Sequence, residues 1–332
     1  MGRGGRRQTA WAAVAVLALL APVACGGGSS SPQSQAQVTI GILRAVRSME
    51  PQNVETFLAE LASGGYAQGR NLRVHGADPG EVHPDPQDAE AVVRTWAEGG
   101  LDLVLALSSS GAMAAARAAP GVKVLFLSND PMAVGLVTDE RRPEANLTGA
   151  TFRVPADRTV DVARRLLPGI TKAGLVYPTS DPAAAPVRDA TVRAGAALNL
   201  QMATAGFATA DEVGAAIEKL RAEGAEVLLL ANAPTTVRNY PAITAALAGT
   251  PMPVIANTTT DFALAILEPD TTELYRQMGR QAVRLLQGSP VSDVPVEDPA
   301  RFRLTVNLKV AAALGIEVPA DVVRTADHVV RP

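Results

Sequence analysis

The chain has 332 residues, of which 47% are hydrophobic and 19% charged, so it can build one large or two medium cores and is not a disordered chain. Its formal net charge is −3, whereas nucleic-acid binding needs a basic face. The composition therefore argues against nucleic acid as a partner and gives no reason to expect a strongly anionic ligand.

The N-terminal region has the organisation of an export signal. Basic residues precede an apolar stretch at 11–20, which is too short to span a bilayer. Cys25, the only cysteine of the chain, follows shortly and leads into a Gly/Ser-rich segment. Because a lone thiol cannot form an internal disulfide, its position indicates a lipobox in which Cys25 becomes the acylated N-terminus. Pro22 departs from the usual lipobox leucine, and an ordinary secretory signal with an incidental cysteine is the alternative.

We therefore predict a lipoprotein signal peptide at 1–24, followed by a lipidated Cys25 and a flexible polar tether at 25–37. The folded body is then extracytoplasmic and lipid-anchored to the cell membrane, for example through palmitate. A cytoplasmic enzyme is incompatible with this prediction.

From residue 38 onward, short apolar runs alternate with amphipathic helical patterns. The runs lie at 38–43, 101–107, 122–127, 172–177, 226–231 and 252–256. Their continuous rather than alternating hydrophobicity is typical of strands covered on both faces, as in parallel sheets flanked by helices. The segment 97–110 also resembles 222–235, since each has a helix end, a glycine turn, a buried run and small polar residues. This weak internal repeat indicates an α/β chain with two similar lobes of a size suited to separate cores.

Small polar residues follow most of these predicted strands. Ser, Thr, Asn and Asp dominate the strand ends at 108–112, 128–131, 178–182, 232–236 and 257–261. In open parallel sheets, ligands bind just beyond the carboxyl ends of the strands. Each segment alone is equally compatible with a helix cap or turn, which favours the same residue types. Their repetition favours a shared polar lining.

Four stretches carry a resemblance to a known family. They lie at 65–81, 128–151 (SNDPMAVGLVTDERRPEANLTGAT), 274–297 and 306–330 (VNLKVAAALGIEVPADVVRTADHVV). With them the chain resembles the ABC-transporter substrate-binding proteins of the tryptophan/tyrosine-binding-like family, across nearly all of 38–330. The resemblance implies a type I periplasmic-binding fold with two Rossmann-like lobes, joined by three crossing segments that close around a ligand.

The resemblance also implies where the lobes begin and end. The crossings are expected near 150–154, 257–263 and 298–306. Lobe 1 then comprises 38–150 plus about 263–298, and lobe 2 comprises 151–262 plus about 299–332. The implied partners are an ABC permease and its ATPase, and the protein is expected to act as a monomer.

The expected ligand-binding residues follow the strand ends. Carried over from the family pattern, they are Ser109, Ser110, Asn129, Asp130, Thr179, Ser180, Asn232 and Thr259. Tyr177 and Asp261 join this set, as a possible stacking surface and a possible partner of a ligand ammonium. The region 257–267 is shorter than the family pattern, which leaves the part played by Thr259 and Asp261 open.

Each candidate has a structural alternative. Ser109 and its neighbours open an alanine-rich helix, whose N-terminus either receives a ligand carboxylate or is simply capped by serine. Asp130 and Asp181 each pair with a ligand ammonium or cap a turn. Tyr177 either stacks on an aromatic ligand or belongs to the core. Arg44 and Arg47 either grip an acidic group or are solvated.

Enzyme chemistry is not expected. The three histidines, at 75, 83 and 328, have no strong metal-ligand spacing, and no dinucleotide or phosphate-binding loop follows a predicted strand. We expect no cofactor and no metal. The sequence predicts a solute-binding lipoprotein of an ABC importer that captures a small polar or zwitterionic solute, most simply an amino acid, which could be aromatic. An extracytoplasmic sensing domain with a membrane signalling partner is the alternative, and an exported hydrolase would require a catalytic serine cluster.

Overall fold

The computed structural model describes residues 37–45, 51–181, 184–230, 234–248 and 252–332. The predicted signal peptide, Cys25, nearly all of the predicted tether, Arg47 and Asn232 lie outside these residues.

The first sheet has five strands in the order β2-β1-β3-β4-β5, and every neighbouring pair is parallel. The strands are β1 (Val38–Leu43), β2 (Leu72–His75), β3 (Leu103–Ala106), β4 (Lys123–Ser128) and β5 (Leu147–Thr151). Residues of β3 and the inner part of β4 are fully buried, as expected for strands covered on both sides.

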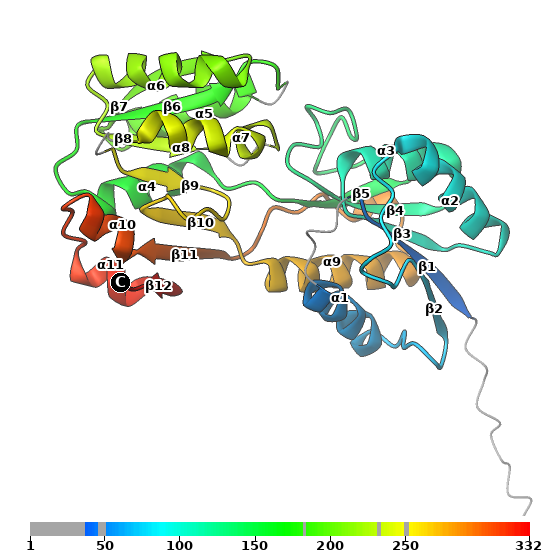
Figure 1. Ribbon diagram of the computed structural model, residues 1–332. Coiled ribbons are helices and arrows are strands. Elements are labelled where there is room, and N and C mark those ends of the chain that lie inside the picture. Colours follow the sequence, from blue (N-terminus) through cyan, green and yellow to red (C-terminus); the bar gives the residue numbers. More distant parts are fainter. Residues whose placement is uncertain (1–36, 46–50, 182–183, 231–233, 249–251) are drawn as a thin grey trace, which may run out of the picture. The chain divides into compact units, whose positions relative to one another are not determined.

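Helices cover both faces of this first sheet (Figure 1). On one face pack α1 (Pro51–Ser63) and α9 (Thr271–Leu286), which lie side by side although more than 200 residues separate them. On the other face pack α2 (Pro86–Glu98) and α3 (Ser109–Ala118). A late segment of the chain therefore completes the core of the first lobe.

The second sheet has seven strands in the order β12-β11-β10-β9-β8-β6-β7, and only the β10–β11 pair is antiparallel. The strands are β6 (Lys172–Pro178), β7 (Gln201–Phe207), β8 (Val227–Leu230), β9 (Val254–Ala256), β10 (Ala265–Pro269), β11 (Phe302–Asn307) and β12 (His328–Val330). Its core again divides into two layers. One contains α4 (Ala156–Leu166), α5 (Ala184–Ala197), α10 (Leu308–Ala313) and α11 (Ala320–Thr325). The other contains α6 (Val213–Ala222) and α8 (Tyr240–Leu247).

The remaining elements are short. Helix α7 (Pro234–Arg238) follows β8, and the 3-10 turns η1 (Ala210–Glu212) and η2 (Val291–Asp293) precede α6 and follow α9. All six strands predicted from apolar runs are present, and the two lobes of a type I periplasmic-binding fold are confirmed.

Three segments cross between the lobes, as expected for this fold, but one crossing lies elsewhere than predicted. The first runs from β5 to α4 and the third from about residue 298 into β11. The predicted second crossing at 257–263 is wrong, because Ala265 of β10 pairs with Ile255 of β9 and with Val306 of β11. The chain therefore stays in the second lobe through Pro269 and crosses at Asp270, so 263–269 does not belong to lobe 1.

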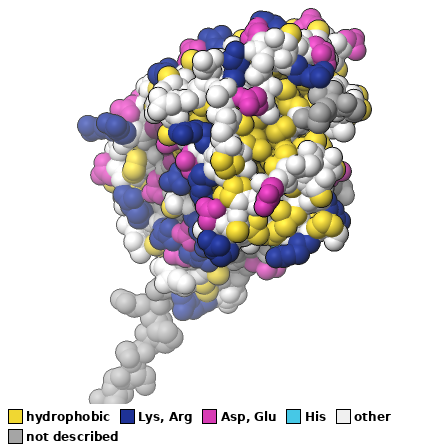
Figure 2. All heavy atoms as spheres, turned by 90° about the vertical axis from the view of Figure 1, so that its left-hand side faces the viewer, with side chains coloured by type: hydrophobic (Ala, Val, Ile, Leu, Met, Phe, Trp, Pro, Cys, Tyr) yellow, Lys and Arg dark blue, Asp and Glu magenta, His cyan; other side chains and the backbone are white. Residues whose placement is uncertain are grey.

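The surface of the described residues is mixed in charge. On the face shown in Figure 2, lysine, arginine, aspartate and glutamate are interspersed around hydrophobic side chains that gather near the middle. Among the residues described, no helix has the length and apolar character that crossing a bilayer requires.

Candidate functional site

A cavity of about 240 Å³ lies where the carboxyl ends of strands from the two sheets converge. The first lobe supplies Ser109, Asn129, Asp130 and Val134, from the segments after β3 and β4. The first crossing supplies Arg153 and Val154, and the second lobe supplies the remainder, from β6, β8, α4, α5, α7 and the end of β9. This is the place where an open parallel sheet holds a ligand.

Four of the residues predicted from the sequence line this cavity: Ser109, Asn129, Asp130 and Tyr177. They come from the ends of three strands, β3, β4 and β6, that belong to different lobes. The polar strand ends therefore do meet at one cavity for these positions, while Asn232 lies outside the described residues.

Five other predicted residues are not part of the lining, and their contacts explain why. The Thr179 hydroxyl donates to the Phe207 carbonyl of neighbouring β7 at 3.1 Å. The Thr259 hydroxyl bonds to a Glu268 carboxylate oxygen at 3.1 Å. Ser180 and Asp261 are exposed side chains, and Ser110 lies within α3 beside Ser108, the two hydroxyl oxygens being 3.4 Å apart. Thr179 and Ser180 lie in a turn and Ser110 at a helix start, as the structural alternatives for these segments expected.

Two short polar side chains of the first-lobe wall, Ser109 and Asp130, are held by local bonds. The Ser108 hydroxyl caps α3 by accepting a bond from the Gly111 N–H at 3.0 Å, whereas the Ser109 hydroxyl is 2.8 Å from that of Ser128. One carboxylate oxygen of Asp130 accepts from the Ala133 N–H at 3.0 Å. Asp130 therefore caps its turn and faces the cavity at the same time.

Arg153 is the only cationic side chain in the lining as described, and two carboxylates hold it. Its guanidinium makes paired bonds to Glu140 of 2.9 and 2.7 Å, and it bonds to one oxygen of Asp298 at 3.0 and 2.8 Å. Burial alone would lower the pKa of Arg153, but the bonds and charges of both carboxylates outweigh burial and raise that pKa above its ordinary value. Glu140 and Asp298, which are not in the lining, compensate the charge of Arg153. With Asp130 and Asp181, the lining is therefore acidic.

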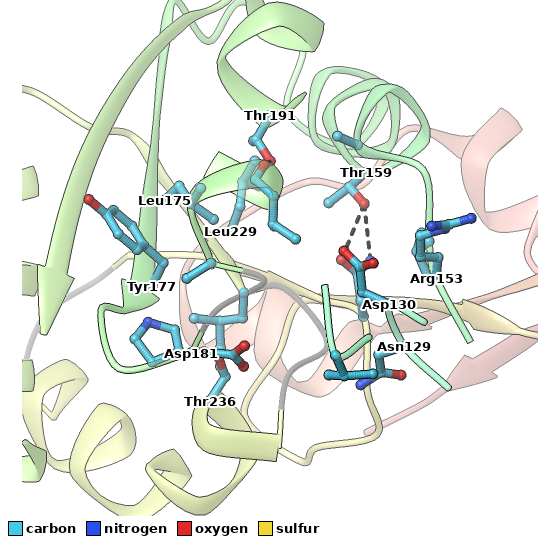
Figure 3. A pocket seen from close by; sticks show the side chains of 18 of the residues that line it. Asn129, Asp130, Arg153, Thr159, Leu175, Tyr177, Asp181, Thr191, Leu229 and Thr236 are labelled. Atoms are coloured by element: carbon cyan, nitrogen blue, oxygen red, sulfur yellow. Dashed lines mark hydrogen bonds between the residues drawn. The ribbon is translucent and has the colours of Figure 1, made fainter. Parts of the chain in front are cut away.

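The second-lobe wall is mainly apolar. Leu175, Leu229 and Val187 face the cavity, and Figure 3 shows the two leucines close to Thr191. Tyr177 is half-buried in this wall, and the Arg188 guanidinium lies 5.7 Å from the centre of its ring. Tyr177 thus contributes to the cavity wall as well as to the core.

Several lining residues could not be predicted from strand ends. Thr159 comes from α4, and its hydroxyl, at which the dashed lines in Figure 3 begin, bonds to the Asn257 side chain at 3.1 to 3.3 Å. Thr191 comes from α5, where its hydroxyl donates to the Val187 carbonyl at 2.8 Å. Asn257 and Thr236, by contrast, lie in the polar stretches 257–261 and 232–236 that follow strands, so the sequence did carry a signal for them.

Arg44 satisfies neither of its predicted alternatives. It is 1% exposed and is not in the lining, so it is neither solvated nor in reach of a ligand there. Its guanidinium donates to the Gly76 carbonyl at 2.5 Å and fastens the segment after β2 to the end of β1. Burial lowers its pKa.

The histidines show no metal centre. His75 stacks on Trp96 with ring centres 5.7 Å apart, and His83 bonds to Glu81 at 3.3 Å. In the described part of the chain, no group of three or more potential ligand side chains could hold a metal ion.

Comparison with known proteins gives a consistent result. Residues 47–330 match the family model described as ABC transporter substrate binding protein. The chain is similar to a tyrosine-binding protein of Clostridioides difficile, with 25% identity over 289 residues that cover 86% of this chain and 83% of that protein.

Two solved structures share the fold. One is a substrate-binding protein with adhesive properties from Clostridium difficile in a ligand-free, open form, with a TM-score of 0.73, 24% identity and coverage of 90% of this chain and 99% of that one. The other is the ABC domain from Streptococcus pneumonia in complex with L-Trp, with a TM-score of 0.68, 20% identity and coverage of 89% and 100%. At these identities the likeness establishes the fold.

Proposed function

Since this chain belongs to the family of ABC transporter substrate-binding proteins, whose members bind rather than catalyse and act outside the cytoplasm, we propose that it captures an amino acid in the cavity between its lobes. The observation that carries the proposal is the charge of the lining. Asp130 and Asp181 face the cavity, while the charge of Arg153 is compensated by Glu140 and Asp298. An acidic lining favours a ligand that bears an ammonium group.

The two ends of an amino acid suit different parts of the cavity. We assign the ammonium to the aspartates and the side chain to the apolar wall at Leu175 and Leu229. We assign the carboxylate to Ser109 and the first turn of α3, because helix N-termini favour anions. An aromatic amino acid is the leading candidate. One relative is named tyrosine-binding, and one solved structure of the same fold holds L-Trp.

The proposal gives the lobes a mechanical role. A ligand that contacts Asp130 in the first lobe and Leu229 in the second favours the closed arrangement by those contacts alone. Closure by bending of the three crossings would then present the loaded protein to a permease and its ATPase.

The decisive experiment is a thermal-shift screen of purified protein, first unfolded in urea and refolded to remove retained solute. An aromatic amino acid at 100 times its Kd is expected to add about 2.7 kcal/mol to the free energy of unfolding. If none of the twenty amino acids raises the midpoint, an amino acid is not the ligand.

We also propose that Cys25 carries a lipid anchor, which keeps the receptor at the membrane. Metabolic labelling with an alkyne analogue of palmitate is expected to mark the wild-type chain and to leave Cys25→Ala unmarked. Label on Cys25→Ala would contradict the anchor without affecting the proposal for the ligand.

A further inference from the structure

Thr236 differs from the other hydroxyl residues of the cavity. It lies on α7, it is 1% exposed, and its side chain belongs to the cavity lining. Its hydroxyl oxygen is buried and has no hydrogen-bond partner among the described residues. Figure 3 shows the residue on the side of the cavity that also holds Asp181.

The other lining hydroxyls are already bonded to the protein. Ser109 is bonded to Ser128, Thr159 to Asn257 and Thr191 to the Val187 carbonyl. Threonines in helices of this protein commonly donate to the carbonyl four residues earlier, as Thr191 does, and this satisfies the hydroxyl locally. Thr236 makes no such bond within the described chain.

A buried hydroxyl without a partner costs free energy, and such groups in native proteins call for an explanation. In an apolar core, valine would fill the same volume without that cost. A hydroxyl at the wall of a ligand cavity gains its partner when the ligand arrives, and the cost is then removed in the bound state.

The neighbourhood of Thr236 indicates which ligand group it meets. Thr236 follows β8 and Asp181 follows β6, and these two strands are adjacent in the second sheet. A ligand carboxylate placed there would meet the like charge of Asp181, whereas an ammonium would be attracted. An ammonium has three donors, and the hydroxyl oxygen supplies an acceptor that one carboxylate cannot provide alone.

We propose that Thr236 is a specificity-determining residue whose hydroxyl accepts a hydrogen bond from the ligand ammonium, beside Asp181. This inference rests on the proposed function, since it requires a ligand with an ammonium group. It adds a residue from α7 to the recognition that Asp130 provides from the opposite lobe.

The test compares Thr236→Val with Thr236→Ser in the urea-stripped protein, with L-tyrosine and L-tryptophan as probes and calorimetry as the readout. The loss of a hydrogen bond to a charged group is expected to weaken binding about 10- to 100-fold in Thr236→Val. Thr236→Ser keeps the hydroxyl and is expected to bind within about threefold of wild type. Equal affinity of Thr236→Val and wild type overturns the inference.

A second measurement separates ligand recognition from a structural role. Thr148 is also fully buried, but its hydroxyl donates to the Val294 carbonyl at 2.5 Å, and neither residue is in the cavity lining. Thr148→Val is therefore expected to lower the melting temperature and leave the affinity unchanged. Thr236→Val is expected to keep or raise the melting temperature of the ligand-free protein. A lowered one would mean that its hydroxyl serves the fold.

A third arm identifies the ligand group. Tyramine keeps the ammonium of tyrosine and lacks the carboxylate, and its weaker binding can be followed by competition. The loss caused by Thr236→Val is expected to persist for tyramine. If that loss disappears with tyramine, Thr236 does not recognise the ammonium. If wild type binds no amino acid, the proposed function has failed, whereas binding that is indifferent to Thr236→Val refutes this inference alone.

Discussion

The two walls of the cavity differ in what they offer to a ligand. The first-lobe wall consists mainly of short polar side chains, Ser109, Asn129 and Asp130, which follow strands of a fully parallel sheet. The second-lobe wall is mainly apolar and includes Leu175 and Leu229, although Asp181 also belongs to it. A ligand whose ammonium contacts Asp130 and whose side chain packs on Leu175 and Leu229 contacts both lobes, and these contacts couple recognition to closure.

The largest expected effect comes from the polar wall. Asp130→Asn removes a carboxylate charge while keeping a side-chain oxygen that can cap the Ala133 N–H. Affinity for the amino acid is expected to fall about 10- to 100-fold, as measured by calorimetry.

Asp139→Asn is the matched control for this change. Asp139 accepts from the Arg141 N–H at 2.8 Å in a similar turn but is not in the cavity lining. If both variants bind like wild type, the first-lobe wall does not supply the charge partner.

The apolar wall is expected to respond more weakly. Val187→Ser removes methyl groups that face the cavity from α5 and is expected to weaken binding about fivefold, equivalent to about 1 kcal/mol. Val192 lies on the same helix and is 40% exposed, so Val192→Ser is the control and is expected to bind normally. Equal effects of the two variants on the Kd would show that the helix as a whole, rather than its cavity face, is responsible.

A smaller effect on affinity is expected when one of the two carboxylates bonded to Arg153 is removed. Glu140→Gln leaves Asp298 as its remaining carboxylate partner, so more of the positive charge reaches the cavity. The Kd for an ammonium ligand is expected to rise about twofold, since a partly exposed pair contributes up to about 1 kcal/mol. Glu144→Gln, in an exposed loop bonded to Thr138, is expected to leave the Kd unchanged. Tighter binding by Glu140→Gln would mean that the ligand is an anion.

The smallest effects concern the acid stability of each lobe. The bond from Arg280 holds the pKa of Glu273 below its ordinary value in the first lobe. In the second lobe burial raises the pKa of Asp327, but bonds from the Leu304 N–H and from Arg301 outweigh it and lower that pKa. A depressed carboxyl pKa stabilises the fold above the unfolded-state pKa of about 4, and this contribution is lost as the pH falls through the folded-state pKa.

Glu273→Gln and Asp327→Asn are therefore each expected to lower the free energy of unfolding at pH 7 by at most about 1 kcal/mol. Below about pH 4 each difference from wild type is expected to shrink. Urea unfolding at pH 7 and at pH 3.5 measures both. A difference that grows in acid would contradict the direction of the pKa shifts.

Much of the fold could be predicted because buried parallel strands leave continuous apolar runs, as at Leu103–Ala106. Strands without such runs were missed. Strand β12, with three residues, is one of them. Strand β10 does lie in an apolar run, at 262–267, but this run follows a polar loop and its segment was assigned to the wrong lobe. Periodicity does not distinguish so short a strand from a crossing segment.

The residues that line the cavity could be predicted only where they directly follow a strand. Asn129 and Asp130 follow β4 directly and line the cavity as predicted. Thr159 and Thr191 lie within helices, and a sequence does not reveal which turn of a helix faces a cavity formed by another lobe. Thr179 follows a strand too, but its hydroxyl bonds to the adjacent strand. The same side chain can serve a turn or a ligand, and only tertiary contacts decide which.

The central claim is that one ammonium-bearing solute is held between Asp130 and the apolar wall. Native mass spectrometry of the stripped protein, incubated with a mixture of the twenty amino acids, tests it directly. The account predicts one amino acid per chain on the wild type and its loss from Asp130→Asn. A wild type that retains no amino acid, or an Asp130→Asn variant that retains the same one equally well, would contradict it.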